Sequence, residues 1–264
     1  MIRLVEAVGR AVTNVVEGFG HFAILAGETL RSAVRPPFRF RLLLHALEFA
    51  GVGSLFIILL CGTFIGMVFA LQAYHGFGLF GAEELVGGTV GVSLAREIGP
   101  VFTAVVFTAR GVSAMATEIG TMRVTEQIDA LQAMAVNPVQ YLIVPRVVAS
   151  VIMVPVLAMV FMSIGMVGAY FVGVILMGLD EGAFIAQAKW WVDAYDITNG
   201  ITKAAVFGLI TSFIGCYQGF RAQGGARGVG IATTRAVVSS VVAIILSDYF
   251  LTVILFAASR KDLG

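Results

Sequence analysis

Apolar stretches that are each about as long as a membrane is thick constrain this chain more than any other feature. Residues 52–74 and 147–177 contain no Asp, Glu, Lys or Arg at all. A helix needs about 20 mostly apolar residues to cross a hydrocarbon core. Three further stretches, residues 88–117, 201–220 and 236–258, reach that length with few charges. The sequence therefore predicts an all-α integral membrane protein with five transmembrane helices.

Composition supports an integral membrane protein and argues against a soluble or nucleic-acid-binding protein. Apolar residues make up 59% of the chain and charged residues 12%, against about 45–50% and about 25% in soluble proteins. A net charge of +1 gives no reason to expect a nucleic-acid partner. Cys61 and Cys216 both fall inside apolar stretches, so we expect two small buried side chains and no disulfide framework.

The N-terminal residues 1–34 have the pattern of an amphipathic helix. Apolar side chains recur every three or four residues, which places them on one helical face, and charged side chains occupy the other. We expect this helix to lie in the membrane interface and to end at Pro36-Pro37. A soluble helix packed on another surface is the alternative. The chain then divides into an interfacial segment, residues 1–40, and one transmembrane domain, residues 41–264.

The distribution of Lys and Arg orients the spans. Eleven of these residues fall on the side of the N-terminus and three on the opposite side. Cytoplasmic loops carry the excess of positive charge, so the N-terminus is expected in the cytoplasm and the C-terminus outside. The outer segment 178–200 contains Trp190, Trp191 and Tyr195, which favour the headgroup layer. We expect a short interfacial helix there.

A short polar helix is expected between the second and third spans. Residues 125–136 have a helical pattern, with Thr125 as the N-cap and Asn137-Pro138 as the stop. Twelve residues extend about 18 Å, too short to cross a membrane. One face is apolar and the rest polar. A soluble partner that binds such a helix can move both adjoining spans; a solvated connector is the alternative. The apolar face is expected to comprise Ile128, Leu131, Met134 and Ala135.

A resemblance to a known family appears in the same region. Residues 96–149 read "REIGPVFTAVVFTARGVSAMATEIGTMRVTEQIDALQAMAVNPVQYLIVPRVVA", and "ATTRAVV" (232–238) and "SDYFLT" (247–252) follow near the end. These motifs closely resemble, in order and spacing, the permease subunits of bacterial maintenance-of-lipid-asymmetry ABC transporters. The resemblance covers about residues 51–257.

The resemblance implies a homodimer in the bacterial inner membrane that moves glycerophospholipid and so maintains outer-membrane lipid asymmetry. The implied partners are a cytoplasmic ABC ATPase, a periplasmic lipid-binding protein with a mammalian-cell-entry (MCE) domain, and a small STAS-domain protein. The short polar helix would be the coupling helix that the ATPase binds. Its implied contact residues are Thr125, Glu126, Gln127, Asp129, Leu131 and Met134.

The chain is not expected to be an enzyme itself. It lacks the G-x-x-x-x-G-K-[ST] phosphate loop, because "GGARGVG" at 224–230 has no Lys-Ser/Thr. ATP and Mg²⁺ would therefore bind the separate ATPase, and no cofactor is expected on this chain. His21, His45 and His75 are isolated in sequence, so no metal site is predicted.

Ionisable residues inside the spans are candidate site residues, since such groups usually face a bundle interior or a wet cavity. Arg96, Glu97 and Lys203 are predicted to line a cavity open to the outer side and to contact a lipid headgroup, because cations suit a phosphate. A structural salt bridge is the alternative. An apolar groove for acyl chains is predicted near the end of the first span. Its candidate residues are Leu71, Tyr74 and Leu79.

Three other charges are predicted to be structural. They are Arg110 and Glu118 in the second span and Asp248 in the fifth, where Asp248 is expected to pair with Arg110, Lys203 or a hydroxyl. A proton relay through Asp248 is the alternative. An ion-coupled secondary transporter or channel, or a lipid enzyme embedded in the membrane, are the competing functions.

Overall fold

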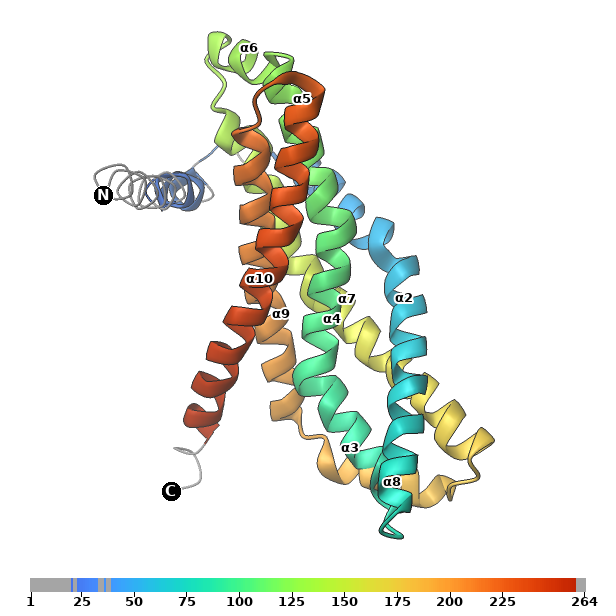
Figure 1. The fold of residues 1–264 in the computed structure, drawn as a ribbon. Coiled ribbons are helices and arrows are strands. Elements are labelled where there is room, and N and C mark those ends of the chain that lie inside the picture. The colour runs from blue at the N-terminus through green and yellow to red at the C-terminus, as the bar shows by residue number, and fades with distance from the viewer. Residues whose placement is uncertain (1–19, 21–22, 33–35, 37–38, 260–264) are drawn as a thin grey trace, which may run out of the picture.

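The computed structural model describes residues 20, 23–32, 36 and 39–259. This part of the chain is a bundle of long helices without a strand (Figure 1). Five helical segments are long and apolar enough to cross a membrane, which confirms the predicted fold class and number of spans. These segments are Phe40–Gly78, Glu83–Val124, Val139–Leu176, Ala194–Phe220 and Gly225–Ala257.

Each span is longer than its apolar stretch, and two of the five are interrupted by π-helical turns. Three spans are single helices: α2 (Phe40–Gly78), α9 (Ala194–Phe220) and α10 (Gly225–Ser259). The second span contains η1 (Glu83–Leu85), α3 (Val86–Ser93), the π turn η2 (Leu94–Ile98), α4 (Gly99–Phe107), the π turn η3 (Thr108–Val112) and α5 (Ser113–Val124). The third contains the π turn η4 (Val139–Ile143), α7 (Val144–Tyr170) and the π turn η5 (Phe171–Leu176).

Glycines bring α2 and α7 into backbone contact. A Cβ atom on Gly66 would overlap the carbonyl oxygen of Gly165, and one on Gly168 would overlap that of Thr63. Small residues at such positions let membrane helices approach closely and pack by van der Waals contact. The buried core around this crossing includes Ile58 and Phe161, so the glycines fix the geometry of the largest apolar cluster.

Two short helices lie at opposite ends of the bundle (Figure 1). One is α6 (Gln127–Ala133) and the other is α8 (Glu181–Trp191). The α8 helix confirms the short helix predicted within residues 178–200, while its place in the membrane interface stays a prediction. Asp180 caps it, because its carboxylate accepts a hydrogen bond from the Ala183 backbone N–H at 2.7 Å.

Most of the predicted N-terminal amphipathic helix falls outside the described residues, namely 1–19, 21–22 and 33–35, as does Pro37. Residues 23–32 are helical and lie beside the bundle in its α6 half (Figure 1). Leu25 and Ala26 pack against a buried cluster that contains Ile119 and Ile128. This segment is therefore attached to the bundle, and its interfacial role and the division at residue 40 stay predictions.

Candidate functional site

A cluster of charges joins the second, fourth and fifth spans around the buried Lys203. Its ammonium donates to Glu97 Oε2 at 2.5 Å, to Asp248 Oδ1 at 3.0 Å and to Thr252 Oγ1 at 2.7 Å. An ammonium has three N–H donors, so all of them are used. Only 3% of the Lys203 side chain is exposed. Of the partners expected for Asp248, the structure selects Lys203 and not Arg110.

A second ion pair lies next to this cluster. Arg96 Nε donates to Asp196 Oδ1 at 2.6 Å, and 1% of the Asp196 side chain is exposed. The other Asp196 oxygen accepts from the backbone N–H of Asp193 at 3.1 Å and completes a capping box at the start of α9. Asp196 was not predicted as a site residue, although the pair Asp193-x-x-Asp196 before an apolar run is a signal for such a cap.

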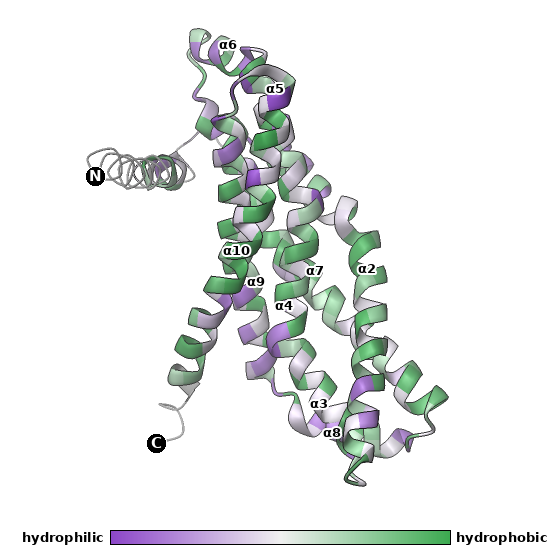
Figure 2. Cartoon of the chain, in the orientation of Figure 1, coloured by the Kyte–Doolittle hydropathy of each residue, from purple (hydrophilic) through white to green (hydrophobic). Residues whose placement is uncertain are grey.

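Close packing between η2 and α9 creates the cluster. Gly200 lies against the carbonyl oxygen of Ala95, where a Cβ atom would overlap it. Lys203 follows Gly200 by three residues and so shares its helical face, which carries the ammonium to Glu97 in η2. Figure 2 shows the hydrophilic stretches of α9 and of the adjoining second span at similar height in an otherwise apolar region.

Arg110 and Glu118, the other charges singled out in the second span, also have partners within the chain, and their structural role stays a prediction. Arg110 donates to the Phe49 carbonyl oxygen and lies 4.5 Å from the centre of the Phe49 ring. Glu118 pairs with Arg146 at 2.8 Å. Both contacts tie the second span to a neighbouring span, α2 or α7, in the half of the bundle that ends at α6.

The charged cluster borders a pocket of about 80 Å³, lined in part by Arg96, Glu97 and Lys203. Small-molecule sites usually measure about 300–1,000 Å³, so this pocket alone is too small for a lipid headgroup. Arg96 keeps 37% of its side chain exposed, whereas Lys203 would have to give up a partner to bind a phosphate. Headgroup contact by these residues stays a prediction.

The predicted acyl groove near the end of the first span stays a prediction. Leu71 and Leu79 are exposed, and Tyr74 packs against the main core. None of the three lines the small polar pocket or the larger apolar cavity of about 700 Å³ between α7 and α8. The sequence analysis missed this larger cavity, because its lining comes from segments that are far apart in the chain.

The short polar helix exists, but its predicted start is wrong. It spans Gln127–Ala133 instead of residues 125–136. Thr125 is not its N-cap, because α5 continues to Val124 and Thr125 Oγ1 donates back to the Thr121 carbonyl oxygen at 2.8 Å. Glu126 occupies the N-cap position with a left-handed backbone, φ 62°. The helix also ends earlier than predicted, at Ala133. At the predicted stop, Asn137 Oδ1 accepts from the Val139 backbone N–H at 2.9 Å, at the start of the next helical segment.

One side of α6 is anchored and the other is open. Ile128 is fully buried beside Ile119 and Leu142, and Leu131 packs on the same cluster. Met134 does not belong to the buried face as predicted, since 66% of it is exposed; the helix ends at Ala133, and Ala135 turns the chain with φ 58°. The exposed side chains of this segment include Glu126, Gln127, Asp129, Gln132 and Met134.

These features define a helical, multi-pass membrane protein of the permease class, with an anchored but exposed helix at one end and ion pairs within its spans. Residues 43–254 match the family described as Permease MlaE, and the chain belongs to this family.

Relatives that are named as permeases match most of the chain. The chain is 38% identical to the intermembrane phospholipid transport system permease protein MlaE of Haemophilus influenzae, over 98% of this chain and 99% of that protein. It is 41% identical to a probable ABC transporter permease protein of Synechocystis, over 81% of each. It is 37% identical to a probable ABC transporter permease protein of Rickettsia bellii, over 97% of this chain and 99% of that one.

Proposed function

We propose that the chain is the transmembrane permease subunit of an ATP-driven system that moves glycerophospholipid between the bacterial inner membrane and a periplasmic MCE-domain carrier. The system maintains the lipid asymmetry of the outer membrane. The name of the Haemophilus relative, an intermembrane phospholipid transport permease, supports the substrate. ATP and Mg²⁺ bind a separate ABC ATPase, with which a small STAS-domain protein associates.

The observation that carries this proposal is that α6 is packed on the bundle by one face and exposes polar side chains on the other. Because Ile128 is fully buried, a force applied to the exposed side of α6 reaches the packed cluster around Ile119 and Leu142. That cluster contains residues of the second, third and fourth spans, so a bound ATPase displaces these spans together. The second span continues from α5 through η3 and α4 to η2, which carries Arg96 and Glu97.

We also propose that the permease works as a homodimer. Arg96 and Glu97 keep 37% and 42% of their side chains exposed, although they belong to a membrane span. Charged groups in a span face protein or water in preference to lipid. A second copy across a wet cavity supplies such surroundings and enlarges the small polar pocket. ATP-driven approach of the two α6 helices then closes this cavity and displaces lipid.

The proposed orientation puts the α6 end and the N-terminus in the cytoplasm and the C-terminus in the periplasm. Arginines are frequent in the connections at the α6 end, whereas Lys189 is the only Lys or Arg in the segment 178–200 at the opposite end. The positive-inside rule supports this direction. An ATPase that uses cytoplasmic ATP then meets α6 directly.

The test removes exposed contacts of α6 without touching its anchor. The double variant Glu126→Ala, Met134→Ala is purified gently from native membranes, and co-purifying ATPase and ATP-dependent lipid transfer are measured. We expect both to fall, with the permease itself still folded. The matched control is Glu84→Ala, Phe80→Ala, which removes one exposed acid and one exposed apolar side chain at the other end and retains the ATPase.

Two results would overturn the proposal. The first is a wild-type chain that purifies without an ATPase, an MCE-domain protein or enriched phospholipid. The second is transfer driven by an ion gradient without ATP, which would favour the ion-coupled carrier.

A further inference from the structure

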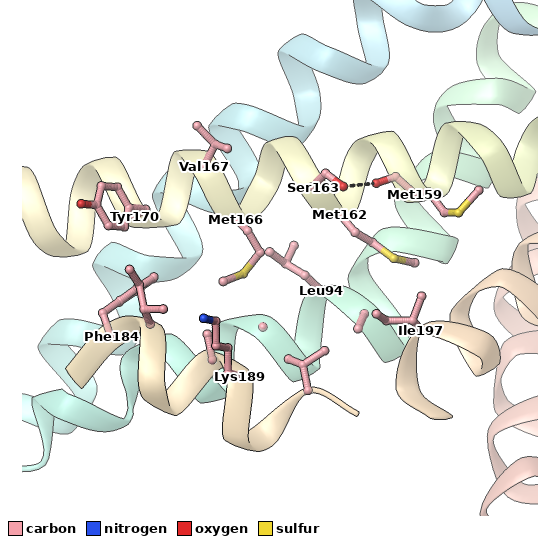
Figure 3. Close-up of a pocket in the computed structure, with 15 residues that line it drawn as sticks. Leu94, Met159, Met162, Ser163, Met166, Val167, Tyr170, Phe184, Lys189 and Ile197 are labelled. Atoms are coloured by element: carbon pink, nitrogen blue, oxygen red, sulfur yellow. Dashed lines mark hydrogen bonds between the residues drawn. The ribbon is translucent and has the colours of Figure 1, made fainter. Parts of the chain in front are cut away.

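A second, larger cavity lies apart from the charged cluster. It measures about 700 Å³, lies between α7 and α8, and is closed on one side by α3 (Figure 3). None of its lining residues belongs to the pocket around Arg96 and Lys203. The α7 wall presents methionines, including Met159, Met162 and Met166. Methionine side chains are unbranched and flexible, so they adapt to irregular apolar partners.

The packing of α8 explains why space remains there. Phe184 docks the start of α8 against the Tyr170 ring, with 5.9 Å between ring centres. Along α3, glycines accept the other face of α8: a Cβ atom on Gly87 would overlap the Phe184 carbonyl oxygen, and one on Gly88 would lie 2.7 Å from the Trp191 ring. These contacts of α8 are thus with α3 and, through Phe184, with Tyr170. The cavity separates the rest of α8 from the methionines of α7.

Lys189 is the one charged side chain that lines this cavity. Figure 3 shows its ammonium on the side of α8 that faces α7. Among the residues that the structure describes, Lys189 has no carboxylate partner within ion-pair distance. Trp190 and Trp191 follow it directly and are exposed. Since such aromatic residues favour the headgroup layer, we expect the ammonium at the depth of lipid phosphates.

We propose that this cavity binds one phospholipid within each single chain, with an acyl chain between α7 and α8 and the phosphate at Lys189. The apolar lining matches an acyl chain, the volume falls within the range of about 300–1,000 Å³ usual for ligand sites, and the free ammonium matches the anionic phosphate. The site goes beyond the proposed transport function, because it needs neither ATP nor a second copy.

The test is photo-crosslinking of the full-length permease in nanodiscs. The probe is phosphatidylglycerol with a diazirine near the end of one acyl chain, and peptides are mapped after illumination. We expect labelling in α7 between Met159 and Tyr170. Ala188→Phe fills the cavity from α8 and should remove this labelling. Ala186→Phe is the matched control, because Ala186 lies on the same helix, is exposed and does not line the cavity.

A second pair of probes tests the role of the ammonium. Lys189→Ala should reduce labelling by the phosphatidylglycerol probe about two- to fivefold, the size expected of an ion pair that water still reaches. Lys189→Arg should restore it, and labelling by a diazirine diacylglycerol, which has no phosphate, should not change. Equal labelling of the Ala188→Phe and Ala186→Phe variants would mean that only the surrounding bilayer lipid is sampled. That result would overturn the site without bearing on ATP-driven transport.

Discussion

Lys203 is a cation inside an apolar bundle, and it is stable there because three acceptors surround it. Glu97, Asp248 and Thr252 come from two other spans, so one ammonium holds three spans in a fixed arrangement. Removing one member of a buried ion pair leaves the remaining charge uncompensated. This lowers stability more than replacing both members by neutral side chains does.

We therefore expect Lys203→Met to lower the free energy of unfolding by about 3 kcal/mol, measured in detergent micelles. The loss arises from the unpaired carboxylates of Glu97 and Asp248, which repel each other. The neutral triple variant Lys203→Met, Glu97→Gln, Asp248→Asn should regain most of the stability. Equal stability of the single and triple variants would contradict this account of the cluster.

Single residues also show which parts of the candidate site could be predicted from the sequence. It identified Arg96, Lys203 and Asp248, because a charge among apolar residues is visible in the chain. It did not identify the partner of Arg96, since the contact with Asp196 depends on the rotation of two helices and on the π turn η2. Pairing within a bundle is a property of helix packing and is not encoded in spacing along one helix.

At the scale of elements, the contact between α2 and α7 depends on the absence of side chains. Gly66 lies against the backbone of Gly165, and both helices contribute to the core around Phe161. A larger residue cannot be accommodated by rotating a flexible neighbour, because the obstacle is backbone.

Gly66→Leu should therefore separate the helices and reduce the yield of folded protein severely. Gly76→Leu on the same helix is the control, because no atom lies within 4 Å of a Cβ at that position, and it should behave like the wild type. Size-exclusion profiles and thermal midpoints in detergent measure the difference. A well-folded Gly66→Leu protein would show that the crossing is not specified by this contact.

The same scale explains the error at α6. Asn137-Pro138 sets only an outer limit to the helix, because proline disfavours helix in the preceding residue; the helix ends earlier, at Ala133, before the left-handed turn at Ala135. Its start was not predictable, because Thr125 can cap a helix or end one, and the length of α5 decided between these roles.

At the scale of the whole molecule, the two short helices mark opposite ends of the bundle. The described spans run alternately up and down between these two ends. Once one connection is assigned to a side of the membrane, the sides of all the other connections follow. The number of spans was predictable from apolar length alone, whereas the cavity beside α8 was not, because it results from the docking of α8 on the glycines of α3.

Cysteine labelling checks the orientation. In a background with Cys61→Ala and Cys216→Ala, we expect Glu84→Cys to react with an impermeant maleimide from the periplasmic side. Gln132→Cys should react only in inside-out vesicles, because it lies on α6. Both positions are exposed, and the permease is produced without the proposed ATPase so that α6 stays uncovered. The opposite pattern would reverse the orientation and place α6 out of reach of cytoplasmic ATP.

The π turns also bear on how the chain can change in length during evolution. A π turn is an α-helix with one extra residue in a single turn, so a one-residue deletion within η3 restores a regular helix and leaves the segments on both sides facing the same neighbours. The same deletion in the middle of α9 would rotate every later side chain by about 100°. Gaps between related sequences should therefore be tolerated at the π turns of the second and third spans and excluded from α9.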